Sequence, residues 1–265
     1  MEISRSIGSL LRRTGSHAAA KHVYRSLFRR ERLRELTRKK LFYRPFVPRG
    51  SLAFDIGANL GNRTEIFLEL GARVIAVEPV PSTAQALSGW QGNDPRFTLV
   101  QKAVGAVESS ATMYVSNLSI LSSMTPDWVE ACKEQPHLRD ASWSTITVDV
   151  TTLDRLIDQY GVPAFTKIDV EGFEVEVLQG LSRPLPALSF EYTPFRAEPA
   201  LECLRLLRRF GPARFNTSPG ESLVLRHEKW LDEDGIVEFC KHQVPREPEF
   251  GDVYVVFDGA TSSII

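Results

Sequence analysis

The chain has 265 residues and a formal net charge of −1, and its 43% hydrophobic and 25% charged residues are typical of a soluble globular protein. This length can hold one large α/β domain and a modest extension. Three widely spaced cysteines without a CxxC pair argue against a zinc site and a disulfide framework, and no apolar run is long enough to cross a bilayer. The N-terminus lacks the pattern of a secretory signal, so we expect a cytoplasmic protein.

The first part of the chain is strongly basic. Residues 1–49 carry 14 Lys and Arg against three Glu, whereas residues 50–265 carry 18 bases and 30 acids. We predict that residues 1–49 form a largely helical extension, because Lys21–Phe42 shows one apolar stripe among its charges. The expected role is a helix docked on the acidic body. Contact with an anionic membrane surface, a nucleic acid or an acidic carrier is an alternative, and an organelle transit peptide is a third.

Residues 50–265 alternate short apolar runs with helical patterns, which predicts an α/β domain with a mostly parallel sheet and helices on both faces. The expected strands are Ser51–Asp55, Arg73–Glu78, Phe97–Gln101, Phe165–Asp169, Ala187–Tyr192, Ala213–Asn216 and Asp252–Phe257. The expected helices are Arg63–Leu70, Ser82–Trp90, Phe173–Gln179 and Glu198–Phe210.

An insertion at about 105–160 interrupts this alternation. Within it we predict two hairpin strands, a helix that follows a Ser-rich stretch, and a helix started by a Thr cap. These segments are Ala111–Ser116, Thr145–Val150, Pro126–Glu134 and Thr152–Tyr160. Because long insertions in compact domains are often functional, we expect this one to form part of a lid over a substrate site.

A Gly-rich corner, residues 55–61, joins the first expected strand to the first expected helix. Gly57 and Gly61 permit a sharp backbone turn and a close approach by a ligand. Glu78 ends the next strand, where an acid can accept hydrogen bonds from ribose hydroxyls. The sequence therefore predicts a nucleoside site, against the alternative that the two glycines serve the turn alone.

The order of residues in the corner favours S-adenosylmethionine over a dinucleotide. The dinucleotide fingerprint is G-x-G-x-x-G, whereas here the order is G-x-N-x-G with Asp55 two residues ahead of the first Gly. An acid at that point repels a diphosphate but suits the ammonium of a methionine tail, and Asn59 can donate to the carboxylate of that tail.

A second acidic segment, Lys167–Glu174, ends the fourth expected strand. In an open α/β sheet the ligand lies beyond the carboxyl ends of the strands, so we expect Asp169 and Glu171 to face it. Glu191, at the end of the fifth strand, is expected to line the same crevice. Glu174 and Glu176 fall on the following helix, where a surface position is expected.

Five segments in this order resemble the FkbM-type methyltransferases: Asp55-Ile-Gly-Ala-Asn-Leu-Gly, Val77-Glu-Pro, Ala103-Val-Gly, Thr152-Leu-Asp and the block from Lys167 to Gly180. The resemblance implies a class I, Rossmann-like methyltransferase fold that methylates oxygen on sugars, glycolipids or polyketide-like products. It also implies a set of positions that bind S-adenosylmethionine and two active-site acids. The implied donor-binding residues are Asp55, Gly57, Asn59, Gly61, Glu78 and Ala103, and the implied acids are Asp169 and Glu171.

An alcohol is a weak nucleophile, so methyl transfer to it requires a positioned base. Asp169 is the first candidate and Glu171 the second; each has an alternative role as a helix cap or a hydrogen-bond partner of Lys167 or the cofactor. The two acids could instead hold Mg²⁺, although the sequence predicts no dedicated metal-ligand set. His137 and His227 are alternative bases.

The expected acceptor is a small molecule or a glycan, and no nucleic-acid partner is expected. The acidic body repels phosphate, and the Asp/Asn-Pro-Pro-Tyr/Phe turn of amino-methylating DNA enzymes is missing after the fourth strand. Two alternatives from other classes remain open. One is a nucleic-acid methyltransferase that uses the basic arm, and the other is a non-catalytic binding module with the same fold. The sequence makes no prediction about the oligomeric state.

Overall fold

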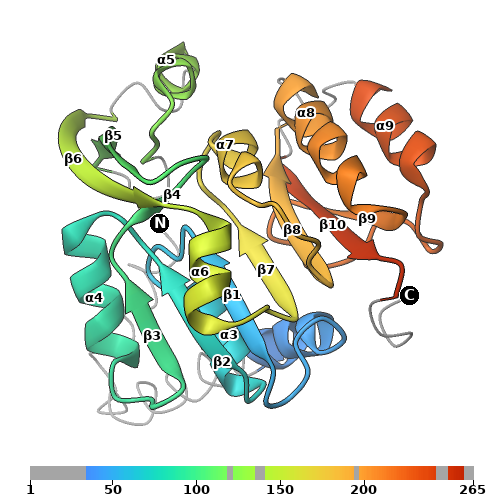
Figure 1. Ribbon diagram of the computed structural model, residues 1–265, viewed down its shortest axis with the longest axis horizontal. Coiled ribbons are helices and arrows are strands. Elements are labelled where there is room, and N and C mark those ends of the chain that lie inside the picture. Colours follow the sequence, from blue (N-terminus) through green and yellow to red (C-terminus); the bar gives the residue numbers. More distant parts are fainter. Residues whose placement is uncertain (1–33, 118–121, 135–140, 194–196, 243–249, 260–265) are drawn as a thin grey trace, which may run out of the picture. The chain divides into compact units, whose positions relative to one another are not determined.

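The computed structural model describes residues 34–117, 122–134, 141–193, 197–242 and 250–259 (Figure 1). The chain divides into two compact units, residues 1–41 and 42–265. In the first unit the described residues are helical, with Lys39 and Glu35 paired at 2.7 Å. The part of the predicted helix before residue 34 lies outside the described residues. Among the described helices, none has the length and apolar character needed to cross a membrane.

Residues 42–49 belong to the second unit, although the sequence placed the boundary of the extension at residue 49. The reason is aromatic packing, because Tyr43 and Phe46 are buried. The Tyr43 ring lies 5.1 Å from the ring of Phe67 and 5.9 Å from that of Phe165. This short segment is therefore part of the core of the globular domain.

The centre of the domain is a seven-stranded sheet, as predicted, with strand order β3-β2-β1-β7-β8-β10-β9 (Figure 1). The neighbours from β3 to β8 are parallel, and β10 is antiparallel to both β8 and β9. The strands are β1 (Leu52–Ile56), β2 (Arg73–Val77), β3 (Phe97–Val100), β7 (Phe165–Ile168), β8 (Ala187–Tyr192), β9 (Ala213–Pro219) and β10 (Gly251–Phe257).

Helices cover both faces of the sheet, as the alternating pattern predicted. Phe54 and Ile56 of β1 face the main core with α6, α7, α8 and α9, whereas Asp55 faces α3, where Thr64 donates a hydrogen bond to it. Leu87 of α4 packs with Ala58 and Ala76. The helices are α3 (Asn62–Glu69), α4 (Pro81–Gln91), α6 (Leu153–Tyr160), α7 (Glu174–Gln179), α8 (Ala197–Leu207), which continues as a 3-10 turn (Arg208–Phe210), and α9 (Glu233–His242).

The insertion forms a second sheet with strand order β4-β6-β5, beside helix α5 (Figure 1). Its elements are β4 (Ala103–Val104), β5 (Ser109–Ser116), α5 (Pro126–Glu134) and β6 (Trp143–Thr151). The predicted hairpin strands and both predicted helices are confirmed, including the cap of α6 by the Thr152 hydroxyl. Strand β4 and helix α9 were not predicted, because β4 has only two residues and α9 contains a glycine in its first turn.

The turn after β1 passes between the ends of β2 and β7. The amides of Gly57 and Ala58 both donate to the carbonyl of Val77, each at 2.9 Å, and the amide of Asp169 donates to the carbonyl of Ile56 at 2.9 Å. Gly57 has a φ of +76°, and a Cβ there would lie 1.8 Å from the carbonyl oxygen of Asp169. Gly57 is therefore required by backbone packing between two strand ends.

We expect Gly57→Ala to lower the free energy of unfolding by several kcal/mol, because the added methyl group forces the backbones of β1 and β7 apart. The matched control is Gly50→Ala, since Gly50 has a similar φ of +79° but has no neighbouring atom within 4 Å of the added Cβ. That control should cost only about 1–2 kcal/mol for the left-handed backbone. Urea unfolding measures both, and equal losses would contradict the packing role of Gly57.

Candidate active site

The Gly-rich corner and Glu78 lie together at the carboxyl ends of β1 and β2. The carboxylate of Glu78 accepts a hydrogen bond from the amide of Asn59 at 2.9 Å and another from the amide of Val80 at 2.9 Å. Burial raises the pKa of Glu78 to about 7, although both amide bonds oppose this shift. The structure thus brings together two parts of the chain that the sequence expected to share one ligand.

Asp55 is buried against the first turn of α3. Its carboxylate accepts a hydrogen bond of 2.5 Å from the Thr64 hydroxyl. Burial raises the pKa of Asp55, and the Thr64 hydrogen bond acts in the opposite direction. Asp55 therefore fixes α3 to the end of β1.

The other residues of the corner have distinct roles. Asn59 has a left-handed backbone with a φ of 47°, and its buried Oδ1 has no hydrogen-bond partner among the described residues. A buried polar atom without a partner is costly, which fits a ligand contact at this point. Gly61 lacks a side chain for packing reasons, because a Cβ there would lie 2.4 Å from Leu87 of α4.

Ala103 lies near the same edge, beyond the end of β3. It is buried at the start of β4 and packs in one apolar cluster with Val80. Since Val80 donates its amide to Glu78, Ala103 lies behind the segment that holds this acid. The six predicted donor-binding residues therefore lie at or beyond the carboxyl ends of three neighbouring strands, β1, β2 and β3.

The acidic end of the site is built on a buried lysine. The ammonium group of Lys167 lies 2.8 Å from Asp252 and 3.2 Å from Asp169. Burial acts to lower the pKa of Lys167, but the charges of these two acids raise it well above its usual value. The Tyr254 hydroxyl donates to the second oxygen of Asp252 at 3.3 Å.

Asp252 is a residue of the site that sequence reasoning missed. It is buried in β10, whose other residues are mostly apolar, and it pairs in register with Glu191 of β8. An acid inside such a strand was the available signal, because a buried carboxylate needs a partner. Its partner could not be identified from the sequence, since Lys167 is 85 residues away along the chain.

Three carboxylates meet beyond the ends of β7 and β8. Oxygen atoms of Asp169, Glu171 and Glu191 lie within 4.8 Å of one another. Burial, followed by the charge of Asp169, raises the pKa of Glu171 well above its usual value. Burial, followed by the charge of Glu171, does the same to the pKa of Glu191. Both shifts disfavour the charged forms of Glu171 and Glu191.

The turn that carries Asp169 and Glu171, residues 169–174, is strained and is held by hydroxyl groups of the insertion. Glu171 is a non-glycine residue with a φ of 53°. The Ser123 hydroxyl donates to the carbonyl of Glu171 at 2.6 Å, and the Thr125 hydroxyl donates to that of Gly172 at 3.0 Å. The insertion therefore fixes the shape of this acidic turn, which is consistent with the predicted location over the substrate site.

The predicted surface position of Glu174 is wrong. The side chain is 5% exposed, and one carboxylate oxygen accepts hydrogen bonds from the amides of Val170 at 3.2 Å and Gly172 at 3.3 Å. Burial raises the pKa of Glu174 to about 7. Glu174 turns inward because it closes the acidic turn on itself, whereas Glu176 is partly exposed.

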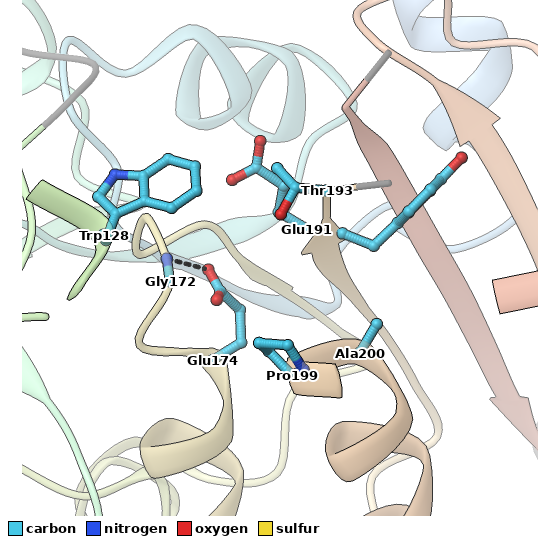
Figure 2. Close-up of a pocket in the computed structure, with 8 residues that line it drawn as sticks. Trp128, Gly172, Glu174, Glu191, Thr193, Pro199 and Ala200 are labelled. Atoms are coloured by element: carbon cyan, nitrogen blue, oxygen red, sulfur yellow. Dashed lines mark hydrogen bonds between the residues drawn. The ribbon is translucent and has the colours of Figure 1, made fainter. Parts of the chain in front are cut away.

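A pocket adjoins the acidic turn and separates Trp128 of the insertion from the first residues of α8 (Figure 2). Trp128 lies directly over Gly172, where a Cβ would be 3.3 Å from the Trp128 Cβ. The residues that line the pocket are Trp128, Gly172, Glu174, Glu191, Tyr192, Thr193, Pro199 and Ala200. These residues include two acids, two aromatic side chains and no Lys, Arg or His.

Asp169, Glu171 and Glu191 are oxygen donors of the kind that Mg²⁺ prefers. However, the ammonium group of Lys167 lies 3.2 Å from Asp169 and already supplies positive charge to this carboxylate. A divalent cation there would be repelled by Lys167. We therefore assign no metal to the site.

His227, one of the two alternative histidine bases, is not part of this group. His227 lies beside β9, where its backbone is hydrogen-bonded to Asn216 and its ring packs edge-on against Phe239 at 5.2 Å. Burial and the charge of Arg226 lower its pKa. His137 lies outside the described residues.

The strand order, the single antiparallel strand β10 and the location of the site beyond the ends of β1, β2 and β7 define a class of protein. These three features are typical of the class I methyltransferase fold, whose ligand crevice lies at the carboxyl edge of the sheet. The chain is similar over residues 55–217 to the family described as the methyltransferase FkbM domain. It belongs to this family and is an S-adenosylmethionine-dependent methyltransferase.

Comparison with solved structures gave similar folds at low identity. A TehB-like methyltransferase from Corynebacterium glutamicum is 13% identical, with 89% of this chain and 99% of that chain covered and a TM-score of 0.43. An O-methyltransferase from Bacillus cereus is 10% identical, with 85% and 81% covered and a TM-score of 0.41. A precorrin-6y C5,15-methyltransferase from Geobacter metallireducens is 8% identical, with 82% and 86% covered and a TM-score of 0.42. No protein of curated function matched the chain.

The raised pKa of Glu174 predicts that stability falls as the pH rises. The unfolded chain has the usual pKa of 4.5 and the folded one about 7, so the folded state holds a proton that the unfolded state loses between these values. Through Glu174, the free energy of unfolding of the wild type should therefore fall by up to about 3 kcal/mol between pH 5 and pH 8. The Glu174→Gln variant should not show this part of the fall.

Urea unfolding of both proteins at the two pH values measures this difference. Gln retains the oxygen that accepts from Val170 and Gly172, so the turn should persist. The control is Glu176→Gln, which removes one charge from the same helix. Identical pH dependence in wild type and Glu174→Gln would contradict the assignment.

Proposed function

We propose that this methyltransferase transfers the methyl group of S-adenosylmethionine to a hydroxyl group of a small molecule or glycan. The observation that carries the proposal is the position of Asp169. This residue follows β7. Its carboxylate pairs with the Lys167 ammonium group, and its side chain is 35% exposed. It thus combines a fixed position with access to an acceptor.

The donor end of the proposed site consists of the Gly-rich corner and Glu78. The orphaned Oδ1 of Asn59 and the carboxylate of Glu78 both offer acceptor capacity at the edge where a nucleoside would lie. Two amides already orient Glu78, which leaves lone pairs for ribose hydroxyls. S-adenosylmethionine supplies an electrophilic methyl group when bound, and the chain holds it in position.

Asp169 serves as the general base in this proposal, with Glu171 as the second candidate. With S-adenosylmethionine bound, the Asp169 carboxylate would accept the proton of an acceptor hydroxyl, whose oxygen would take the methyl group and release S-adenosylhomocysteine. Lys167 pairs with the Asp169 carboxylate and orients it, and Asp252 in turn pairs with Lys167. Glu171, whose pKa is raised by burial, suits a hydrogen bond to the acceptor better than proton removal.

The pocket beside the acidic turn supports a neutral, hydroxyl-rich acceptor. Carboxyl groups of Glu174 and Glu191 can bind hydroxyls, and Trp128 offers an apolar face of the kind on which a sugar ring packs. The described residues that line the pocket include no Lys, Arg or His, which disfavours a phosphate ligand, so nucleic acid is not a proposed substrate. A cytoplasmic location remains part of the proposal.

The proposal is tested in two steps. Calorimetric titration with S-adenosylmethionine and S-adenosylhomocysteine should show binding, and a panel of glycosides, glycolipids, polyketide-like alcohols, DNA and RNA should then be assayed with labelled methyl donor. Incorporation into a hydroxyl compound is expected. Methyl transfer to nucleic acid alone would overturn the acceptor class, and no binding at millimolar donor would favour the non-catalytic alternative.

We expect Glu78→Ala to weaken S-adenosylmethionine binding by at least about tenfold, because it removes the carboxylate that is available to the ribose. The fold should persist, since Glu78 lies at the edge of the sheet and its partners are the two amides of the loop. Calorimetry measures the affinity and circular dichroism the fold. Glu202→Ala, at a half-buried acid on α8 that pairs with Arg205, is the control, and an unchanged affinity in Glu78→Ala would remove Glu78 from the donor site.

We expect Asp169→Asn to retain donor affinity within about twofold but to lower kcat by at least about a hundredfold, because an amide cannot accept the acceptor proton. The change preserves the shape of the side chain next to Lys167. Steady-state kinetics on an acceptor found in the panel measures kcat, and calorimetry measures donor binding. Full turnover in Asp169→Asn would transfer the role of base to Glu171 or exclude a protein base.

A further inference from the structure

Arg63 is a buried cation that the proposed reaction has not yet used. It is the second residue of α3, directly beyond the Gly-rich corner, and only 7% of it is exposed. Its Nε has no hydrogen-bond partner among the described residues. Within the described part of the chain, the guanidinium group makes one ion pair, at 2.6 Å to Glu221, whose side chain is 61% exposed. One solvated acid is a weak partner for a buried group with five donors.

The position of Arg63 is fixed relative to the donor end of the site. The next residue, Thr64, donates to Asp55, which ties the first turn of α3 to the end of β1. The guanidinium group also lies 5.9 Å from the centre of the Tyr43 ring, in the core of the same domain. Its charge lowers the pKa of both Asp55 and Asp252 against their burial. Arg63 therefore lies between the Gly-rich corner and the Lys167–Asp252 pair.

The start of α3 offers a second feature that favours an anion. Its first residue is preceded by Gly61, which has no side chain to cap the helix, so the helix makes no side-chain cap hydrogen bond. The amides at a helix N-terminus attract negative charge, and an arginine beside them can bind a carboxylate through two parallel hydrogen bonds. Asp55 and Glu78, the acids nearest the corner, cannot attract such an anion.

We propose that Arg63 binds the carboxylate of the methionine tail of S-adenosylmethionine. The inference rests on the proposed binding of the donor at the Gly-rich corner and adds the residue that recognises its anionic end. Asp55, at the end of β1, offers carboxyl oxygens that can accept hydrogen bonds from the ammonium of that tail. Glu221 holds the guanidinium group from the solvent side and leaves the remaining donors to the ligand.

The test compares S-adenosylmethionine with decarboxylated S-adenosylmethionine, which differs only by the carboxylate. Calorimetry with the wild-type chain should show at least about tenfold weaker binding of the decarboxylated compound. In Arg63→Gln the affinity for S-adenosylmethionine should fall by at least about tenfold, and the affinity for the decarboxylated compound should stay within about twofold. The preference for the carboxylate should therefore disappear in the variant.

Two other variants separate this role from a structural one. Arg205→Gln, on the exposed face of α8, should leave both affinities unchanged. Glu221→Gln should also retain the preference, because the ion pair with Glu221 is not the contact that recognises the ligand. If Arg63→Gln does not fold, Arg63→Lys keeps the charge but loses the two-pronged contact, and it should weaken S-adenosylmethionine binding several-fold without affecting the decarboxylated compound.

The outcomes distinguish the inference from the proposed function. Equal weakening of both ligands by Arg63→Gln, or by Arg63→Lys, would overturn the carboxylate contact and leave Arg63 a structural residue. Equal affinity of both ligands for the wild-type chain would overturn it as well. If neither ligand nor 5′-methylthioadenosine binds the wild-type chain, the donor site itself is wrong and the inference fails with it.

Discussion

The site depends on the close backbone contact between the turn after β1 and the end of β7. Gly57 approaches the carbonyl of Asp169 so closely that no side chain fits between them, and its amide is bonded to the end of β2. Three strand ends are therefore held in one arrangement by main-chain atoms. Because the donor end follows β1 and β2 and the proposed base follows β7, this contact fixes the distance between the two halves of the reaction.

Charge balance is the second constraint on the molecule. The carboxyl edge of the sheet gathers Asp55, Asp169 and Asp252 on one face, with Lys167 buried among them. Buried charges are tolerated only in pairs and with hydrogen bonds, and Lys167 meets this requirement with two acids. Arg63 does not meet it with Glu221 alone, which is the physical reason for assigning it an anionic ligand.

The insertion contributes to the site through side chains that hold the main chain of the acidic turn in place. Hydroxyls of Ser123 and Thr125 hold the carbonyls of the acidic turn, and Trp128 covers Gly172. The turn keeps Glu171 in a left-handed conformation that such a residue rarely adopts. The segment that lines this pocket thus also supports the strained turn that bears Asp169 and Glu171 (Figure 2).

The sequence by itself determined the seven strands of the main sheet, most of the helices, the Gly-rich corner, Glu78 and the acids of the fourth strand, because periodicity, turn glycines and motifs are local in the chain. Only the tertiary structure decided which distant residues complete the site. Asp252 meets Lys167 across 85 residues, and Glu221 meets Arg63 across 158. The inward position of Glu174 was also decided by folding, since its partners are amides exposed by one tight turn. The two long-range contacts follow from strand pairing and burial, and no local pattern encodes them.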